Sequence, residues 1–139
     1  APGKRPRNTN TPFIIMKDGK PLMSFGLMGG SMQPQGHVQV LVNIIDYGMN
    51  VQEAGDAARF NHDGGSQPTG QHEDPLGTLY VEPGVADATI AELEAMGHKV
   101  EVDANGVRFG GYQAIMRDHE NGVYVGASES RKDGHAAGY

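Results

Sequence analysis

The sequence contains no cysteine, and it has no apolar segment long enough to cross a membrane. Without cysteine, a thiol nucleophile, a thiolate metal site and a disulfide are all excluded, and the redox state of the compartment stays open. A membrane-spanning helix needs about 20 consecutive apolar residues, so no membrane span is expected in this chain. The polar, basic segment over residues 1–10 lacks the apolar centre of a signal peptide. The sequence therefore leaves both a cytoplasmic and a periplasmic or secreted location open.

The sequence also lacks a concentrated basic surface. Its formal net charge is −6. Five of its 11 lysines and arginines lie near the two ends, at Lys4, Arg5, Arg7, Arg131 and Lys132. Without a long basic stripe, nucleic acid is not expected as a partner. The 139 residues are 37% hydrophobic and 20% charged, which is too apolar for a disordered chain and is sufficient for one domain with a core.

Glycine is present in excess. The chain has 21 glycines among its 139 residues, about twice the usual share of about 7%. Three pairs stand out, at Gly29-Gly30, Gly64-Gly65 and Gly110-Gly111. Glycine adopts positive φ without steric cost, so a tight turn is the favoured interpretation for each single pair. The alternative is that a pair brings backbone N–H groups close to a ligand.

Hydrophobic periodicity and turn residues predict an alternation of strands and helices. Strands are expected at residues 12–17, 21–28, 79–82, 99–103, 113–117 and 123–127, and helices at residues 35–47, 51–58 and 87–96. Asn50 with Glu53 three residues later predicts a capping box at the start of the second helix. Because hairpins dominate, we expect an α+β fold with a mainly antiparallel sheet and helices layered on it.

Three further segments carry specific expectations. The helix over residues 35–47 is apolar on nearly all sides, so we expect it to be covered from both sides and to need the rest of a larger protein. The loop over residues 61–78 is polar and long. The tail over residues 128–139 is expected to be a strap on the surface.

No complete catalytic motif is present, since the sequence has no P-loop, no GxSxG and no HExxH. Gly29-Gly30 lies between a predicted strand and a predicted helix, where its N–H groups can stabilise the oxyanion of an acyl-transfer reaction. A plain strand-to-helix turn is the alternative. Histidines and acids at His62-Asp63 and His72-Glu73-Asp74 could bind a metal, but a solvated loop without support for the ligands is favoured, so no metal is expected.

Short segments along the chain resemble segments of one known family and occur in the same order. These segments are Gly3-Lys4-Arg5-Pro6, Thr11-Pro12, Lys17-Asp18-Gly19-Lys20-Pro21, Met28-Gly29-Gly30-Ser31, Gln39-Val40-Leu41-Val42-Asn43, Asp46-Tyr47-Gly48-Met49-Asn50, Ala57-Ala58-Arg59-Phe60, Glu82-Pro83-Gly84, Gly97-His98-Lys99-Val100, Gly111-Tyr112-Gln113-Ala114-Ile115, Gly126-Ala127-Ser128, Arg131-Lys132-Asp133-Gly134 and Gly138-Tyr139. Nearly the whole chain thereby resembles the gamma-glutamyltranspeptidase family of N-terminal-nucleophile hydrolases. The segment over residues 32–37 differs from typical transpeptidases and is more similar to an acylase-like or amidohydrolase-like branch.

The resemblance implies an αββα sandwich. It also implies a precursor that cuts itself into a large and a small subunit. Residues 1–139 would be the C-terminal portion of the small subunit, an incomplete domain whose partners are the large subunit and the remaining small-subunit segment. The family acts through an acyl-enzyme on an N-terminal threonine, which is not found in this chain and is expected upstream. The substrate would be a small-molecule amide, with glutathione metabolism as the usual context, and no cofactor is expected.

The resemblance also implies roles for four residues. The family's oxyanion-hole glycines correspond to Gly29 and Gly30, and its two substrate-placing serines correspond to Asn8 and Thr9. The alternative function is a non-catalytic binding or scaffold homologue that retains the fold. The first residue of the missing upstream segment separates the two, because a threonine after a cleavage site favours the enzyme.

Overall fold

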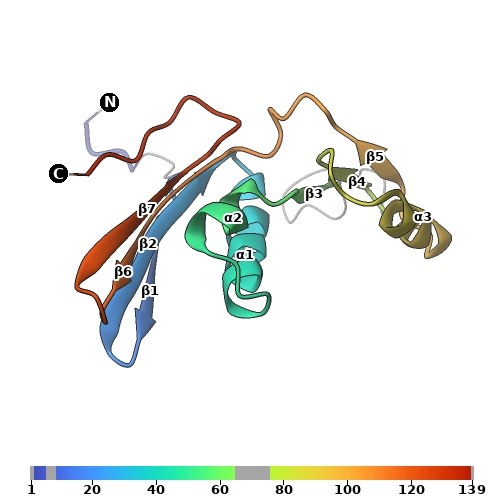
Figure 1. The fold of residues 1–139 in the computed structure, drawn as a ribbon. Helices are drawn as coiled ribbons and strands as arrows, with labels where there is room; N and C mark the ends of the chain where they lie inside the picture. The colour runs from blue at the N-terminus through green and yellow to red at the C-terminus, as the bar shows by residue number, and fades with distance from the viewer. Residues whose placement is uncertain (1, 6–8, 65–75, 139) are drawn as a thin grey trace.

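The chain folds around one four-stranded sheet with two helices on one of its faces (Figure 1). The computed structural model describes residues 2–5, 9–64 and 76–138. The sheet has the order β1-β2-β6-β7 and every neighbouring pair is antiparallel. Its strands are β1 (Phe13–Lys17), β2 (Lys20–Met28), β6 (Gly111–Asp118) and β7 (Val123–Ser128). The predicted hairpins at both ends of the chain are thus confirmed.

Helices α1 (Met32–Ile45) and α2 (Val51–Asp56) cover one face of this sheet. Every second residue of β2, namely Met23, Phe25 and Leu27, is buried towards them. Gly36 allows α1 to approach closely, because a Cβ at this position would lie 2.8 Å from a methyl group of Leu27. The core therefore lies between β2 and α1, directly below the turn that joins them.

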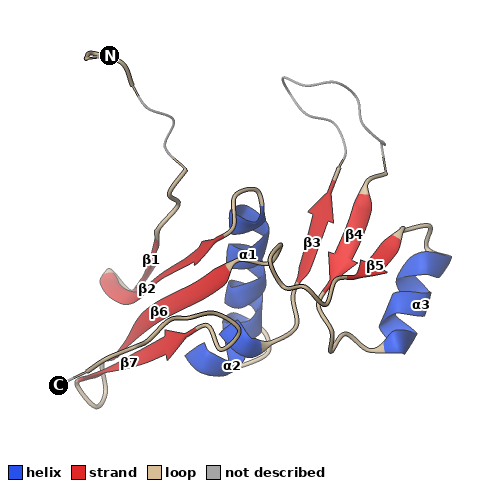
Figure 2. Ribbon diagram, turned by 90° about the horizontal axis from the view of Figure 1, so that it is seen from above, coloured by secondary structure: helices blue, strands red, loops and turns tan. Residues whose placement is uncertain are grey.

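A second, smaller sheet stands beside the first (Figure 2). Its order is β3-β4-β5, with β3 (Phe60–Asp63) antiparallel to β4 (Thr78–Val81). Helix α3 (Asp87–Ala95) connects β4 to the parallel strand β5 (Val100–Val102). An α+β fold with mainly antiparallel strands is what the sequence predicted.

Two boundaries differ from the prediction. Helix α1 begins at Met32, whereas residues 29–36 were expected to be mostly loop. Pro34 is the third residue of the helix, and a proline in the first turn leaves no hydrogen bond of the helix unmade. The prediction missed β3 and placed its residues 61–63 in the long polar loop.

Glutamine side chains of α1 explain why β3 forms despite its polar sequence. Gln39 donates to the carbonyl of Phe60 at 2.9 Å and accepts from its N–H at 2.9 Å. Gln35 bonds the carbonyl and N–H of His62 in the same way, at 2.9 and 2.8 Å. Residues four apart in a helix are separated by about 6 Å along its axis and residues two apart in a strand by about 6.6 Å, so the two spacings match. We call these four hydrogen bonds the glutamine ladder.

Within the described residues α1 is covered on one side only, so the expected cover by the rest of a larger protein stays a prediction. Val38 is 60% exposed and Ile45 is 69% exposed, while the buried residues are Met32, Gly36, His37 and Val40. In α3, likewise, no residue is buried, and Met96, which directly follows the helix, is 73% exposed. Among the described residues, nothing covers the outer sides of these helices. The capping box at Asn50 and Glu53 is confirmed, with both reciprocal hydrogen bonds present.

The tail crosses the face of the large sheet opposite to the helices (Figure 1). A Cβ at Gly126 on β7 would lie 3.0 Å from Ala136, and a Cβ at Gly134 would meet Gln113 and Ser128. The predicted surface strap is thereby confirmed for residues 130–138, whereas Glu129 is buried. In the described part of the chain, every helix is too short or too polar to cross a bilayer.

Two arginines and two glutamates, far apart in the sequence, form an ionic cluster in which Arg59, Glu82 and Glu129 are buried. Arg59 pairs with both oxygens of Glu82 at 2.9 and 3.0 Å and with Glu129 at 3.0 Å. Arg131 bridges the same two carboxylates, with 2.8 Å to Glu82. Glu129 also accepts from the N–H of Tyr112 at 3.2 Å. The cluster, which we call the Arg59 cluster, joins the segment after α2, the end of β4, β6 and the tail.

His37 satisfies a backbone donor of β2 next to the place where β1 begins. Its Nε2 accepts from the N–H of Leu27 at 3.1 Å, and the side chain is only 1% exposed. The rings of Phe13 and Phe25 pack against it. Burial lowers the pKa of His37, because the charged imidazolium is disfavoured away from water.

We expect the stability of the protein to fall as the pH is lowered from 6.5. The pKa of His37 is lower in the folded state than the ordinary value of 6.5, so the unfolded state binds more protons and folding weakens below this pH. Protonation would also remove the acceptor for Leu27. Melting temperatures between pH 7.5 and 5 on the full-length protein test this. His37→Gln keeps an acceptor without a charge, so it should flatten the curve, and an unchanged slope would contradict the role of His37.

Candidate functional site

The turn between β2 and α1 is the centre of the candidate site. Gly29 has φ 136° and Gly30 has φ 61°, and residues other than glycine adopt such backbone conformations only at an energetic cost. Their carbonyls accept from the N–H groups of Met32 and Gln33 at 3.1 and 3.2 Å. Their own N–H groups have no acceptor among the described residues. Neighbouring unpaired N–H groups can bind an anion where they point to a common place.

A second glycine segment holds this turn from below. A Cβ at Gly29 would lie 3.1 Å from the Cα of Gly110 and 3.3 Å from the Cβ of Met32. A Cβ at Gly110, whose φ is 70°, would overlap the carbonyl oxygen of Met28. The backbone just before β6 thus touches the turn directly, so the shape of the turn is fixed by close packing.

Gln33 brings the segment near the N-terminus to the same turn. Its Nε2 donates to the carbonyl of Thr9 at 2.8 Å and to that of Gly30 at 3.3 Å. Thr11 donates to the Oε1 of Gln33 at 2.6 Å. The structure therefore places Thr9 beside the Gly29-Gly30 turn, while Asn8 lies outside the described residues. Sequence reasoning missed Gln33, although it follows the glycine pair by only three residues.

A hollow of about 460 Å³ opens on the turn. It is lined by Gly29, Ser31, Asn61, Asp103, Asn105, Val107 and Arg108. We call it the Asn61 pocket. Asn61 is only 3% exposed, and its Nδ2 has no hydrogen-bond partner in the described part of the chain. A buried donor without a partner is uncommon in folded proteins and points to a missing acceptor.

Arg108 closes one side of this pocket and its charge is already compensated. Its guanidinium pairs with Asp63 at 2.8 Å and lies 3.5 Å from Asp103. It also stacks on the ring of Tyr80, with 3.7 Å between the guanidinium carbon and the ring centroid. The pocket therefore offers one arginine against two carboxylates and has no surplus positive charge.

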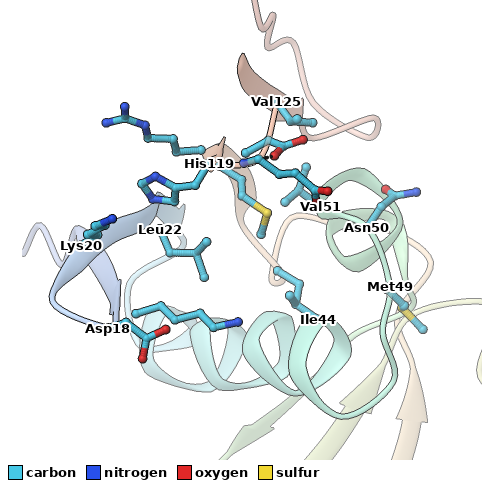
Figure 3. Close-up of a pocket in the computed structure, with 14 residues that line it drawn as sticks. Asp18, Lys20, Leu22, Ile44, Met49, Asn50, Val51, His119 and Val125 are labelled. Atoms are coloured by element: carbon cyan, nitrogen blue, oxygen red, sulfur yellow. Dashed lines mark hydrogen bonds between the residues drawn. The ribbon is translucent and has the colours of Figure 1, made fainter. Parts of the chain in front are cut away.

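A different hollow lies near the β1–β2 turn (Figure 3). It has a volume of about 720 Å³, and Leu22, Ile44, Val51 and Val125 give it apolar walls. Its rim carries charges of both signs, and His119 is held there by the carbonyl of Pro21 at 2.9 Å. None of its lining residues is a serine, threonine or cysteine, so this hollow offers no hydroxyl or thiol nucleophile of those kinds.

The described residues do not support the metal site that the sequence analysis considered as an alternative. Within them, no three histidine, cysteine, aspartate or glutamate side chains come together in a group that could hold a metal ion. His62 is instead bonded to the carbonyl of Leu76 at 2.9 Å. His72, Glu73 and Asp74 lie outside the described residues, so the expectation of no metal stays a prediction.

Comparisons with known proteins agree on one family. A family model described as gamma-glutamyltranspeptidase matches residues 1–139. The chain is 38% identical over 139 residues to the glutathione hydrolase proenzyme of Escherichia coli (strain K12), covering 99% of this chain and 22% of that protein. It is 36% identical over 140 residues to the oxamate amidohydrolase proenzyme of Klebsiella pneumoniae, covering 100% of this chain and 25% of that protein.

The similarity extends to solved structures. The crystal structure of cephalosporin acylase from Bacillus halodurans matches with a TM-score of 0.79 and 38% identity, over 92% of this chain and 22% of that one. The chain spans about a fifth to a quarter of the length of these curated relatives.

Proposed function

Because this chain belongs to the gamma-glutamyltranspeptidase family, we propose that it forms the C-terminal portion of the small subunit of an amide-cleaving enzyme. Its partners would be the large subunit and the remaining small-subunit segment, both from one precursor. The relatives named as proenzymes support this assembly. The proposed substrates are small-molecule amides, since the relatives are named as hydrolases of glutathione and of oxamate.

The observation that carries the proposal is the pair of unpartnered N–H groups at Gly29 and Gly30. In the proposed reaction, the hydroxyl oxygen of an N-terminal threonine on the missing segment attacks the carbonyl carbon of the amide. The threonine's α-amino group accepts the hydroxyl proton and then passes it to the leaving amine as the C–N bond breaks. The two N–H groups would stabilise the negative oxygen of the tetrahedral intermediate. Water, or an acceptor amine, then cleaves the resulting ester.

Thr9 would contribute to holding the substrate. Gln33 holds the backbone of Thr9 beside the turn, and Thr9 is exposed. Asn8 is proposed to take part in the same role. Because these two positions carry serines in the family's usual pattern, we propose an acyl group other than gamma-glutamyl as the preferred one. This suits the acylase-like and amidohydrolase-like branch.

Expression of the full-length precursor tests the proposal. We expect mass spectrometry to show two chains, the smaller beginning with threonine, together with release of amine from glutathione, oxamate or a related amide. Replacing that threonine with alanine should leave one uncut chain without activity, because both steps need the same hydroxyl. A precursor that stays uncut and inactive in its natural sequence would favour the alternative, a binding or scaffold homologue.

A further inference from the structure

The Asn61 pocket touches the turn of the proposed oxyanion hole, and the glutamine ladder holds it there. Gly29 and Ser31 form one wall, while Asn61 comes from β3. The ladder bonds the backbone of Phe60 and His62, the two residues that flank Asn61. Gln35 and Gln39 therefore fix the distance between Asn61 and the turn.

The polar groups of the pocket define what it can bind. Asn61 offers a buried N–H donor that lacks an acceptor. Asp103, with 22% of its side chain exposed, offers a carboxylate that accepts hydrogen bonds. Because Arg108 is compensated by Asp63 and Asp103, a free carboxylate would gain little there. A neutral amide suits the pocket, since its oxygen accepts from Asn61 and its N–H donates to Asp103.

We propose that the Asn61 pocket is a subsite for the amine side of the substrate and selects leaving groups that carry a neutral amide, such as a peptide bond. This inference rests on the proposed function. Thr9, the residue proposed to act on the acyl side, is not among the pocket's lining residues. The acyl and amine sides of the substrate would thus meet different surfaces beside the same turn. Asn61 would contact the substrate, whereas Gln35 and Gln39 are positioning residues.

Two amides of one acyl group test this in the full-length, processed enzyme. One has p-nitroaniline as the leaving group and the other has glycinamide, which carries a further amide. Asn61→Leu keeps a similar volume and removes the donor. We expect about a tenfold loss of kcat/KM for the glycinamide substrate, the usual scale for one buried hydrogen bond, and little change for the anilide. An equal change for both substrates would overturn the subsite.

A second variant keeps the test decisive if Asn61→Leu folds poorly. Val107 lines the pocket and is 75% exposed, so Val107→Phe should narrow the pocket without disturbing the core. It should raise KM for the glycinamide substrate by several fold and by more than KM for the anilide, whose leaving group has no further amide to place in the pocket. His62→Gln is the control, because it changes β3 outside the pocket and should leave the ratio of the two substrates as in the natural enzyme. If the natural enzyme cleaves neither amide, the proposed function fails together with this inference. If it cleaves the anilide and the variants show no preference, only the inference fails.

Discussion

Gly30→Val should lower the turnover of the processed enzyme by about 10²–10³-fold, which is the usual cost of losing one oxyanion donor. Gly30 has φ 61°, and a valine there would push the backbone away from this conformation and move the N–H group. Within this chain an added Cβ at Gly30 meets no atom within 4 Å. The variant should therefore fold and keep its subunits, with only the strain of a left-handed valine, about 1–2 kcal/mol.

Gly122→Val is a matched control for that strain. Gly122 has φ 70° and an added Cβ there also meets no atom within 4 Å, but it lies in the turn between β6 and β7. Both variants should lower the melting temperature to a similar extent, whereas only Gly30→Val should lose turnover. Near-normal turnover in folded Gly30→Val would remove the oxyanion role, and equal loss in both variants would point to strain alone.

Arg59→Met should lower the free energy of unfolding by about 3–5 kcal/mol, since removing one member of a buried ionic group leaves the others uncompensated. Arg59 is 1% exposed and Glu129 is 2% exposed, so water cannot replace the lost partner. Chemical denaturation of the processed enzyme measures the effect. Glu101→Gln is the control, because Glu101 pairs with Lys99 while 47% of its side chain is exposed, and such pairs contribute about 0–1 kcal/mol. Equal stability of the two variants would show that the Arg59 cluster is dispensable.

The sequence predicted the structural features that depend on residues close together in the chain. The β1–β2 and β6–β7 hairpins follow from alternating side chains around turn residues, and the Asn50 capping box follows from local spacing. The family and its fold class, an α+β part of the αββα sandwich, are also confirmed by the comparisons. The chain itself has one four-stranded sheet with two helices on one of its faces.

What the sequence did not predict depends on contacts between distant residues. β3 needs Gln35 and Gln39, which lie more than 20 residues earlier in the chain. The Arg59 cluster joins residues up to 72 positions apart, from Arg59 to Arg131, and no periodic pattern reports such a grouping. For the site, the sequence placed the glycine pair correctly between strand and helix. It missed the Asn61 pocket, because its walls come from three separate segments.

The glutamine ladder also affects how readily the chain can aggregate. A strand with an unpaired edge is a template on which another chain can add a strand, and this is a route to aggregation. The outer edge of β3 is occupied by two side chains of the same molecule. An incoming strand would have to break four hydrogen bonds before it could form its own. Gln35 and Gln39 thus protect this edge from pairing with copies of the chain.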